Sequence, residues 1–219
     1  MFGSGLILSL SGFLVWAIAP RHLIKVPQLW ARISMAALRL FCGIDIRVQG
    51  RDHLPEGGAV IAAQHQSTLD ILIWLIVLER PVFVFKRELR KLPFFGTLLV
   101  PTGMIPVDRG GAGQALRRMV ADCSASLASG HQIVLFPEGT RVAPGQRGRL
   151  RPGVAALALA TTAPVIPAAT DSGLRWGPRA FGKTPGTASL KLFPPLEPGL
   201  SQEEILAHLA TVFYETGVD

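Results

Sequence analysis

Short apolar runs separated by polar loops dominate the chain from residue 45 onward. The runs are rich in β-branched side chains, which favour strands, and they alternate with segments whose apolar residues recur at helical spacing. We therefore predict strands at residues 46–48, 60–63, 82–85, 104–107, 133–136, 165–168 and 188–193. Strands that alternate with helices predict an α/β fold, in which a mostly parallel sheet is flanked by helices.

Helical spacing marks several of the intervening segments. A helix is predicted to open at residues 71–75, and the last helix begins at a capping box formed by Ser201 and Glu204. A third helix has its buried face at Leu116, Met119, Val120, Cys123 and Leu127. The Gly- and Pro-rich segments 141–152 and 171–185 are predicted loops.

The N-terminal residues have a different pattern. Residues 1–20 carry no charged side chain, and their length is close to the ~20 residues that a membrane helix needs. A signal peptide is the alternative because residues 17–19 resemble a cleavage site, but no basic segment precedes the apolar run. We expect a retained anchor, and the basic flank of Arg21, His22 and Lys25 predicts that the rest of the chain lies on the cytoplasmic side of the cell membrane.

Residues 28–44 form a predicted amphipathic helix. Its apolar positions are Leu29, Ile33, Ala36, Ala37, Leu40 and Phe41. Arg32 and Arg39 flank them, so the helix either packs into the core or lies at a membrane interface. We expect residues 1–44 to form an N-terminal membrane-associated segment and residues 45–219 to form one α/β domain.

Composition narrows the class of partner. The chain has 219 residues, enough for one domain, and its net charge of +7 favours an anionic partner such as nucleic acid or a membrane surface. Only 17% of the residues are charged and 49% are hydrophobic, so we predict membrane lipids as a partner. A single tyrosine provides few of the interleaved aromatic side chains that single-stranded nucleic acid needs, so we predict no nucleic acid partner. The two cysteines have no metal-type spacing, and no metal is predicted.

His65 and Asp70 lie where a predicted strand turns into a helix. A neutral imidazole accepts a proton from a hydroxyl only when its tautomer is fixed, and a carboxylate on the other ring nitrogen fixes it. Asp70 is spaced to be that carboxylate, which predicts a general base. The alternative is that Asp70 is a helix N-cap, and a His–Asp pair at this spacing also arises by chance.

Basic residues follow three other predicted strands. Lys86, Arg109 and Arg141 each come at or just beyond a strand end. If those strands are parallel, the three cations converge on the sheet edge that carries His65. A guanidinium group can donate two parallel hydrogen bonds to the oxygens of one phosphate, and Gly139 lets the backbone approach a ligand closely. The pattern favours a phosphate site over isolated surface charges.

Four short motifs occur in a fixed order. They are His65-x-x-x-x-Asp70, residues 103–109, the Phe-Pro-Glu-Gly-Thr-Arg sequence at residues 136–141, and Val-Ile-Pro at residues 165–167. Their sequences and order resemble the 1-acylglycerol-3-phosphate acyltransferase (lysophosphatidic acid acyltransferase) family of glycerolipid acyltransferases. The resemblance covers residues 60–169, and Gln64 stands where the family usually has Asn.

The resemblance implies a reaction and the residues that perform it. It implies His65 as general base and Asp70 as its orienting partner. It implies an acceptor site at Lys86, Arg109, Glu138, Gly139, Thr140 and Arg141. The acyl group of acyl-CoA or acyl carrier protein would pass to a lyso-glycerophospholipid, with 1-acylglycerol-3-phosphate giving phosphatidic acid, or to another lyso-lipid such as lyso-ornithine lipid. No cofactor beyond the thioester is expected.

Two other classes of function stay open. The sequence has no Gly-x-Ser-x-Gly elbow, which favours direct attack by a substrate hydroxyl on the thioester. A membrane-associated serine hydrolase would use Ser67 as its nucleophile, although triad members normally come from distant segments. A non-enzymatic lipid-binding protein would use the basic loops and give His65 and Asp70 no role.

Overall fold

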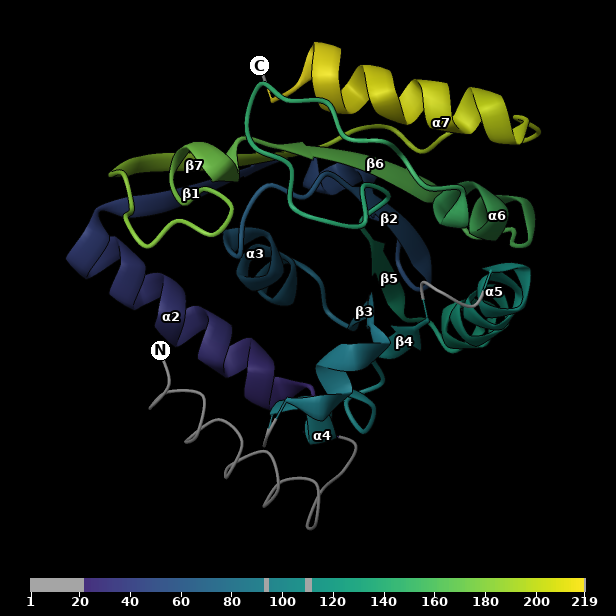
Figure 1. The fold of residues 1–219 in the computed structure, drawn as a ribbon, viewed down its shortest axis with the longest axis horizontal. Coiled ribbons are helices and arrows are strands. Elements are labelled where there is room, and N and C mark those ends of the chain that lie inside the picture. The colour runs from purple at the N-terminus through teal and green to yellow at the C-terminus, as the bar shows by residue number, and fades with distance from the viewer. Residues whose placement is uncertain (1–21, 93–94, 109–111, 219) are drawn as a thin grey trace.

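The computed structural model describes residues 22–92, 95–108 and 112–218. Within these residues, seven strands form one sheet in the order β1-β7-β6-β2-β5-β3-β4 (Figure 1). The strands are β1 (Ile44–Gln49), β2 (Ala59–Ala63), β3 (Pro81–Lys86), β4 (Ile105–Val107), β5 (Gln132–Leu135), β6 (Val165–Thr170) and β7 (Gly186–Leu192). Each lies within two residues of its predicted ends.

The sheet is mostly parallel, which confirms the predicted fold class. Strands β6, β2, β5, β3 and β4 run parallel, whereas β7 is antiparallel to β6 and parallel to β1. Because the carboxyl ends of parallel strands lie at one edge, the loops after β2, β5 and β3 emerge side by side. His65 follows β2, residues 138–141 follow β5, and Lys86 is the last residue of β3.

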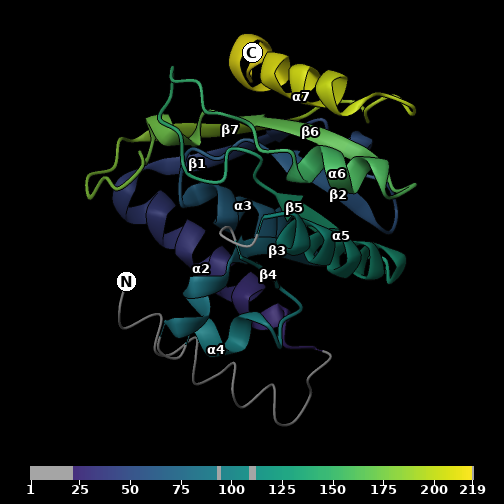
Figure 2. The same ribbon diagram turned by 45° about the vertical axis from the view of Figure 1, so that its right-hand side comes forward.

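Helices cover both faces of the sheet (Figures 1 and 2). They are α2 (Lys25–Cys42), α3 (Leu69–Val77), α4 (Phe95–Leu99), α5 (Ala112–Ala128), α6 (Gly153–Leu159) and α7 (Gln202–Thr211). The short turns are η2 (Arg51–His53), η3 (Arg87–Lys91), η4 (Ser172–Leu174) and the π-helical turn η5 (Val212–Thr216). Alternate residues of β2 enter opposite layers, since Ile61 packs with α2 and α3 while Val60 packs with α5, α6 and α7.

Helix α2 packs on α3 through one face and leaves its other face exposed. Gln28, Ala31, Met35 and Leu38 are the buried residues. The apolar positions predicted from spacing lie on the exposed face, where Leu40 is 76% exposed and Phe41 is 81% exposed. These predicted positions therefore do not supply the contact with the core. The helix is capped by Gly43, whose positive φ of 64° suits a residue without Cβ.

The predicted membrane anchor at residues 1–20 lies outside the described residues. Among the helices that the structure describes, none combines the length and the apolar character needed to cross a bilayer.

Candidate active site

The loop between β2 and α3 wraps around the Asp70 carboxylate. Asp70 Oδ2 accepts hydrogen bonds from the backbone N–H groups of Gln66 and Ser67, each at 2.8 Å. Asp70 itself lies in the first turn of α3, and Thr68 occupies the N-cap position instead. The carboxylate therefore holds the preceding loop in place.

His65 and Asp70 form the hydrogen-bonded pair that the spacing predicted. His65 Nδ1 lies 2.9 Å from Asp70 Oδ2, and the Asp70 side chain is fully buried. The imidazole stacks on Phe136 with ring centroids 4.0 Å apart, and its side chain stays 16% exposed. With the proton on Nδ1, Nε2 carries the lone pair that accepts a proton, so the geometry is that of an oriented general base.

Ser172 is a site residue that the sequence interpretation missed. It begins η4, two residues after the end of β6, and its buried hydroxyl donates a hydrogen bond to Asp70 Oδ1. Both oxygens of Asp70 are therefore engaged. From the sequence, residues 171–185 were predicted only as a loop. The contact of Ser172 with Asp70 arises because β6 lies beside β2, and no local pattern in the sequence shows that pairing.

The loop after β5 holds the backbone of His65 on both sides. Glu138 Oε2 accepts from the His65 N–H at 2.6 Å, and the His65 carbonyl oxygen accepts from the N–H of Val142 at 2.8 Å. The other oxygen of Glu138 accepts from the hydroxyl of Tyr214 at 2.8 Å. Glu138, predicted to bind the acceptor, is buried with both carboxylate oxygens engaged by protein donors. Its position supports the loop that carries His65.

Burial also changes the ionisation of Glu138. Removal of the carboxyl from water raises the pKa of Glu138 to about 7, and the nearby charge of Asp70 adds to the rise. The hydrogen bonds from His65 N–H and Tyr214 act in the opposite direction, because they favour the ionised form. Glu138 therefore changes its protonation near neutral pH.

Arg141 follows a tight turn and reaches the corner between β2 and α3, which carries His65, Thr68 and Asp70. Gly139 adopts a φ of 69°, a left-handed conformation that glycine adopts without steric cost. Thr140 and Arg141 follow on the surface, and Arg141 Nη1 donates to Thr68 Oγ1 at 3.0 Å. The guanidinium group thus lies next to the N-terminus of α3, close to His65. This position agrees with the expectation that Arg141 and His65 follow parallel strands and lie at the same edge of the sheet.

Lys86 and Arg109 are less closely connected to this corner. Lys86 ends β3 in register with Val107, and its Nζ lies 3.9 Å from Glu88 Oε1. It lies at the same edge of the sheet as His65, but β5 separates its strand from β2. Arg109 lies outside the described residues. The structure therefore brings Arg141, and not Lys86, into contact with the corner.

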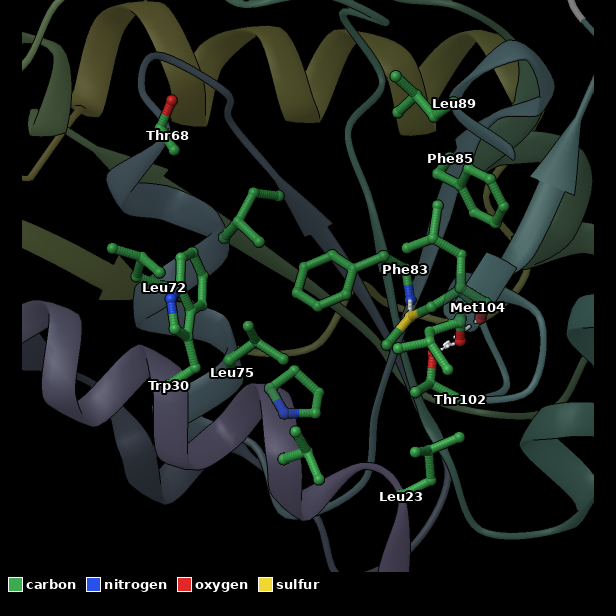
Figure 3. Close-up of a pocket in the computed structure, with 15 residues that line it drawn as sticks. Leu23, Trp30, Thr68, Leu72, Leu75, Phe83, Phe85, Leu89, Thr102 and Met104 are labelled. Atoms are coloured by element: carbon green, nitrogen blue, oxygen red, sulfur yellow. Dashed lines mark hydrogen bonds between the residues drawn. The ribbon is translucent and has the colours of Figure 1, made fainter. Parts of the chain in front are cut away.

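An apolar groove begins at the same corner. It encloses about 330 Å³ between α2, α3, β3 and the segment around α4. Figure 3 shows Thr68 at one end and Leu23 at the other, with Trp30, Leu72, Leu75 and Phe83 between them. Thr68 lines the groove and also accepts the hydrogen bond from Arg141. An apolar chain in this groove would end beside the His65–Asp70 pair.

No metal site is formed by the residues that the structure describes, since no three His, Cys, Asp or Glu side chains gather in a group that could hold an ion. Cys42 and Cys123 are free thiols. Burial raises the pKa of Cys123 to about 12, with a smaller contribution from Asp122. Cys123 therefore stays protonated in the core.

The fold and the site define an α/β protein whose polar groups gather at the carboxyl edge of a parallel sheet. Residues 45–171 match the model of the Acyltransferase family. The chain belongs to this family, which confirms the resemblance predicted from the four motifs. The match ends immediately before Ser172.

Similar proteins carry one recurring name. The chain is 35% identical over 169 residues to the 1-acyl-sn-glycerol-3-phosphate acyltransferase of Pseudomonas aeruginosa. The aligned region covers 77% of this chain and 66% of the relative. It is 26% identical over 203 residues to the enzyme of that name from Cocos nucifera, covering 91% of this chain and 65% of the relative. The chain thus spans just under two thirds of the length of these relatives.

A solved structure shares the fold. The 1-acyl-sn-glycerophosphate (LPA) acyltransferase, PlsC, from Thermotoga maritima superposes with a TM-score of 0.70 at 22% sequence identity. The similarity covers 94% of this chain and 92% of that chain, so it includes the helices on both faces of the sheet.

Proposed function

We propose that this protein is an O-acyltransferase that moves an acyl group from a thioester to the free hydroxyl of 1-acylglycerol-3-phosphate, giving phosphatidic acid. The observation that carries the proposal is the His65–Asp70 pair, held at 2.9 Å beside the end of an apolar groove. The names of the relatives support the same acceptor.

The reaction follows from the orientation of the imidazole. His65 Nε2 takes the proton of the acceptor hydroxyl while the hydroxyl oxygen attacks the thioester carbonyl carbon. The carbon–sulfur bond then breaks, and the proton passes from the imidazolium to the leaving thiolate. The fully buried Asp70 side chain, bonded to Nδ1, stabilises the imidazolium that forms between the two steps.

The groove supplies the binding of the acyl donor. Each methylene group removed from water contributes about 0.8 kcal/mol to binding. Burial of the acyl chain in the groove therefore provides most of the binding free energy of the donor. Because Thr68 is part of both the groove and the catalytic corner, a chain bound along the groove presents its carbonyl group near His65. The donor is acyl-CoA or acyl carrier protein.

The local geometry disfavours the serine hydrolase. Ser67 is fully buried, and its Oγ accepts from the N–H of Leu69 at 3.1 Å. Its backbone N–H donates to Asp70. Ser67 therefore stabilises the start of α3, and its hydroxyl is not placed as a nucleophile activated by His65.

An assay with labelled acyl-CoA separates the three classes of function. The purified protein is incubated with labelled acyl-CoA and lysophosphatidic acid, and the lipid products are separated. Labelled phosphatidic acid supports acyl transfer. Labelled free fatty acid supports the hydrolase, and unchanged donor supports the binding protein. Parallel reactions with lyso-ornithine lipid and with acyl carrier protein as donor identify the second acceptor and the carrier.

Replacement of Arg141 by Ala should weaken the phosphate-bearing acceptor. Charge-assisted hydrogen bonds contribute ~1.5–3 kcal/mol each, so we expect the acceptor KM to rise by about one to two orders of magnitude. Arg141→Lys should restore only part of the loss, because a point charge does not replace a planar fork. The donor KM should change little. The measurement is the KM of both substrates for each variant.

The control for this prediction is Arg118→Ala, since Arg118 is exposed on α5 and away from the corner. A phosphate-free lyso-lipid provides the second comparison. Equal losses on both acceptors would show that Arg141 does not recognise phosphate.

We also propose that the protein binds the cytoplasmic side of the cell membrane. The exposed apolar face of α2, which includes Leu40 and Phe41, and the net charge of +7 support this location. The full chain should stay with membranes through a high-salt wash, because salt does not screen apolar burial. Removal of residues 1–20 should weaken the attachment more than salt does.

The contribution of α2 is measured in the shortened chain. There, Leu40→Ser with Phe41→Ser should lower binding to anionic vesicles by about tenfold, because two apolar side chains no longer leave water. Leu174→Ser, at another exposed leucine, is the control. Recovery of the intact chain in the soluble fraction would contradict the proposal.

A further inference from the structure

The π-helical turn η5 is attached to both sides of the catalytic loop. The carbonyl oxygen of Phe213 accepts from Gln64 Nε2 at 3.0 Å, and the hydroxyl of Tyr214 donates to Glu138 Oε1 at 2.8 Å. Gln64 directly precedes His65 in the chain, and Glu138 accepts from the His65 N–H. Two consecutive residues near the C-terminus therefore contact the groups that hold His65.

The hydroxyl of Tyr214 joins three segments. It accepts from the N–H of Gly148 at 3.0 Å while it donates to Glu138, and the carbonyl oxygen of Gly148 lies 3.2 Å away. Burial and the carboxylate of Glu138 raise the pKa of Tyr214 far above its usual value. Tyr214 therefore stays protonated, and its hydroxyl remains a donor throughout the physiological pH range.

We propose that Tyr214 is a positioning residue, whose hydroxyl keeps Glu138 aimed at the backbone N–H of His65 and thereby holds the catalytic histidine in place. Tyr214 lies outside the matched family region, residues 45–171. The proposal rests on the proposed acyl transfer for its kinetic test, whereas its test by titration does not need activity.

The ionised form of Glu138 is the one that serves this arrangement. A carboxylate accepts from both His65 N–H and Tyr214, whereas a carboxylic acid must donate from one of its oxygens. The pKa of Glu138 is already raised to about 7 by burial, with Asp70 adding to the rise, and the two hydrogen bonds oppose it. Arg147, whose guanidinium carbon lies 5.9 Å from the ring centroid of Tyr214, lowers the pKa of the phenol.

Loss of the Tyr214 hydroxyl should therefore raise the pKa of Glu138. Without the donor, the pKa of Glu138 rises further, and the protonated form persists to higher pH. The acidic limb of the kcat profile should move to higher pH by roughly one unit in Tyr214→Phe. At neutral pH, kcat should fall about tenfold while both KM values stay unchanged, because no substrate contact is removed.

The test compares Tyr214→Phe with Glu215→Gln. Glu215 lies on the same turn and pairs with Arg147 at 3.4 Å, so its substitution perturbs η5 without removing the hydroxyl. The protonation of Glu138 is followed by NMR of protein labelled with ¹³C at the glutamate carboxyl carbons. The Glu138 signal is assigned by its absence from Glu138→Gln. We expect a higher midpoint in Tyr214→Phe and an unchanged midpoint in Glu215→Gln.

The second variant strengthens the hydrogen bond that Tyr214 donates instead of removing it. The chain contains a single tyrosine, so growth on 3-fluorotyrosine modifies Tyr214 alone. Fluorine makes the phenol a stronger donor, which should lower the Glu138 midpoint while the ring and its packing are retained. The result does not depend on whether Tyr214→Phe folds.

Two results would overturn the proposal. One is a Glu138 midpoint that is the same in the wild type, Tyr214→Phe and the fluorinated protein. The other is a loss of kcat in Tyr214→Phe that Glu215→Gln reproduces without any shift of the pH profile. If the wild type transfers no acyl group, the proposed function fails, and the NMR midpoints still decide whether Tyr214 controls Glu138.

Discussion

His65→Ala should abolish acyl transfer and leave the fold intact. In the proposed mechanism the imidazole accepts a proton in the attack step, and general-base catalysis typically contributes about 10²–10⁴-fold to a rate. Its ring packs on Phe136 but remains partly exposed, so its removal costs little packing. We expect kcat to fall by at least about 10²-fold with acceptor and donor KM unchanged. The measurement is steady-state kinetics together with the melting temperature.

The control is His208→Ala, because His208 is an exposed histidine on α7. Added imidazole offers a second check, since it fits the space left by the side chain of His65 and should restore part of the rate. A fully active His65→Ala protein with unchanged acceptor affinity would exclude the proposed mechanism.

Asp70→Asn should lower kcat nearly as much as His65→Ala. The substitution removes the negative charge of the side chain but keeps its size and shape. Asp70 Oδ2 accepts from two backbone N–H groups and from His65 Nδ1, so the amide oxygen of Asn takes this place. The amide nitrogen then faces the hydroxyl of Ser172, which can turn to accept. The loop keeps its hydrogen bonds, but the imidazolium loses its buried counter-charge, and we expect kcat to fall by about 10²-fold or more.

The matched control is Asp122→Asn, which removes an exposed carboxylate from α5. Circular dichroism and melting temperature establish whether Asp70→Asn keeps the fold. Unchanged kcat in a folded Asp70→Asn protein would show that the charge of Asp70 has no part in catalysis.

The strands of this fold are readable from local sequence, but their order is not. Each strand is an apolar β-branched run bounded by polar residues, and such a run is visible within a few residues. The placement of β7 between β1 and β6 depends on contacts between distant segments. Helix α6 was also not predicted, because Gly153–Leu159 is too short and too uniformly apolar to show a helical period.

The face of α2 that enters the core was likewise not readable. Spacing pointed to the stripe that includes Leu40 and Phe41, whereas the core contact uses Ala31, Met35 and Leu38. Both stripes recur at helical spacing, so periodicity alone does not distinguish them. The choice depends on the position of α3, which packs against only one of the two.

The contact between His65 and Asp70 was predictable because its geometry is local. His65 lies in the loop between β2 and α3, and Asp70 lies in the first turn of α3. Their spacing, the strand before them and the start of the helix can therefore be read from one short stretch of sequence. The position of Arg141 required one further step, the expectation that neighbouring strands are parallel. That expectation follows from alternating strands and helices, and it is also a property of sequence.

The groups that support this pair come from distant segments, and their positions depend on how the whole chain packs. Ser172 meets Asp70 from a separation of 102 residues, and Tyr214 meets Glu138 from a separation of 76. Neither contact leaves a local pattern, because a hydroxyl at the end of a strand or on a helical turn is common in any sequence. Buried carboxylates must find donors to offset the loss of water, and which donors reach them depends on how the sheet and its last helix pack together.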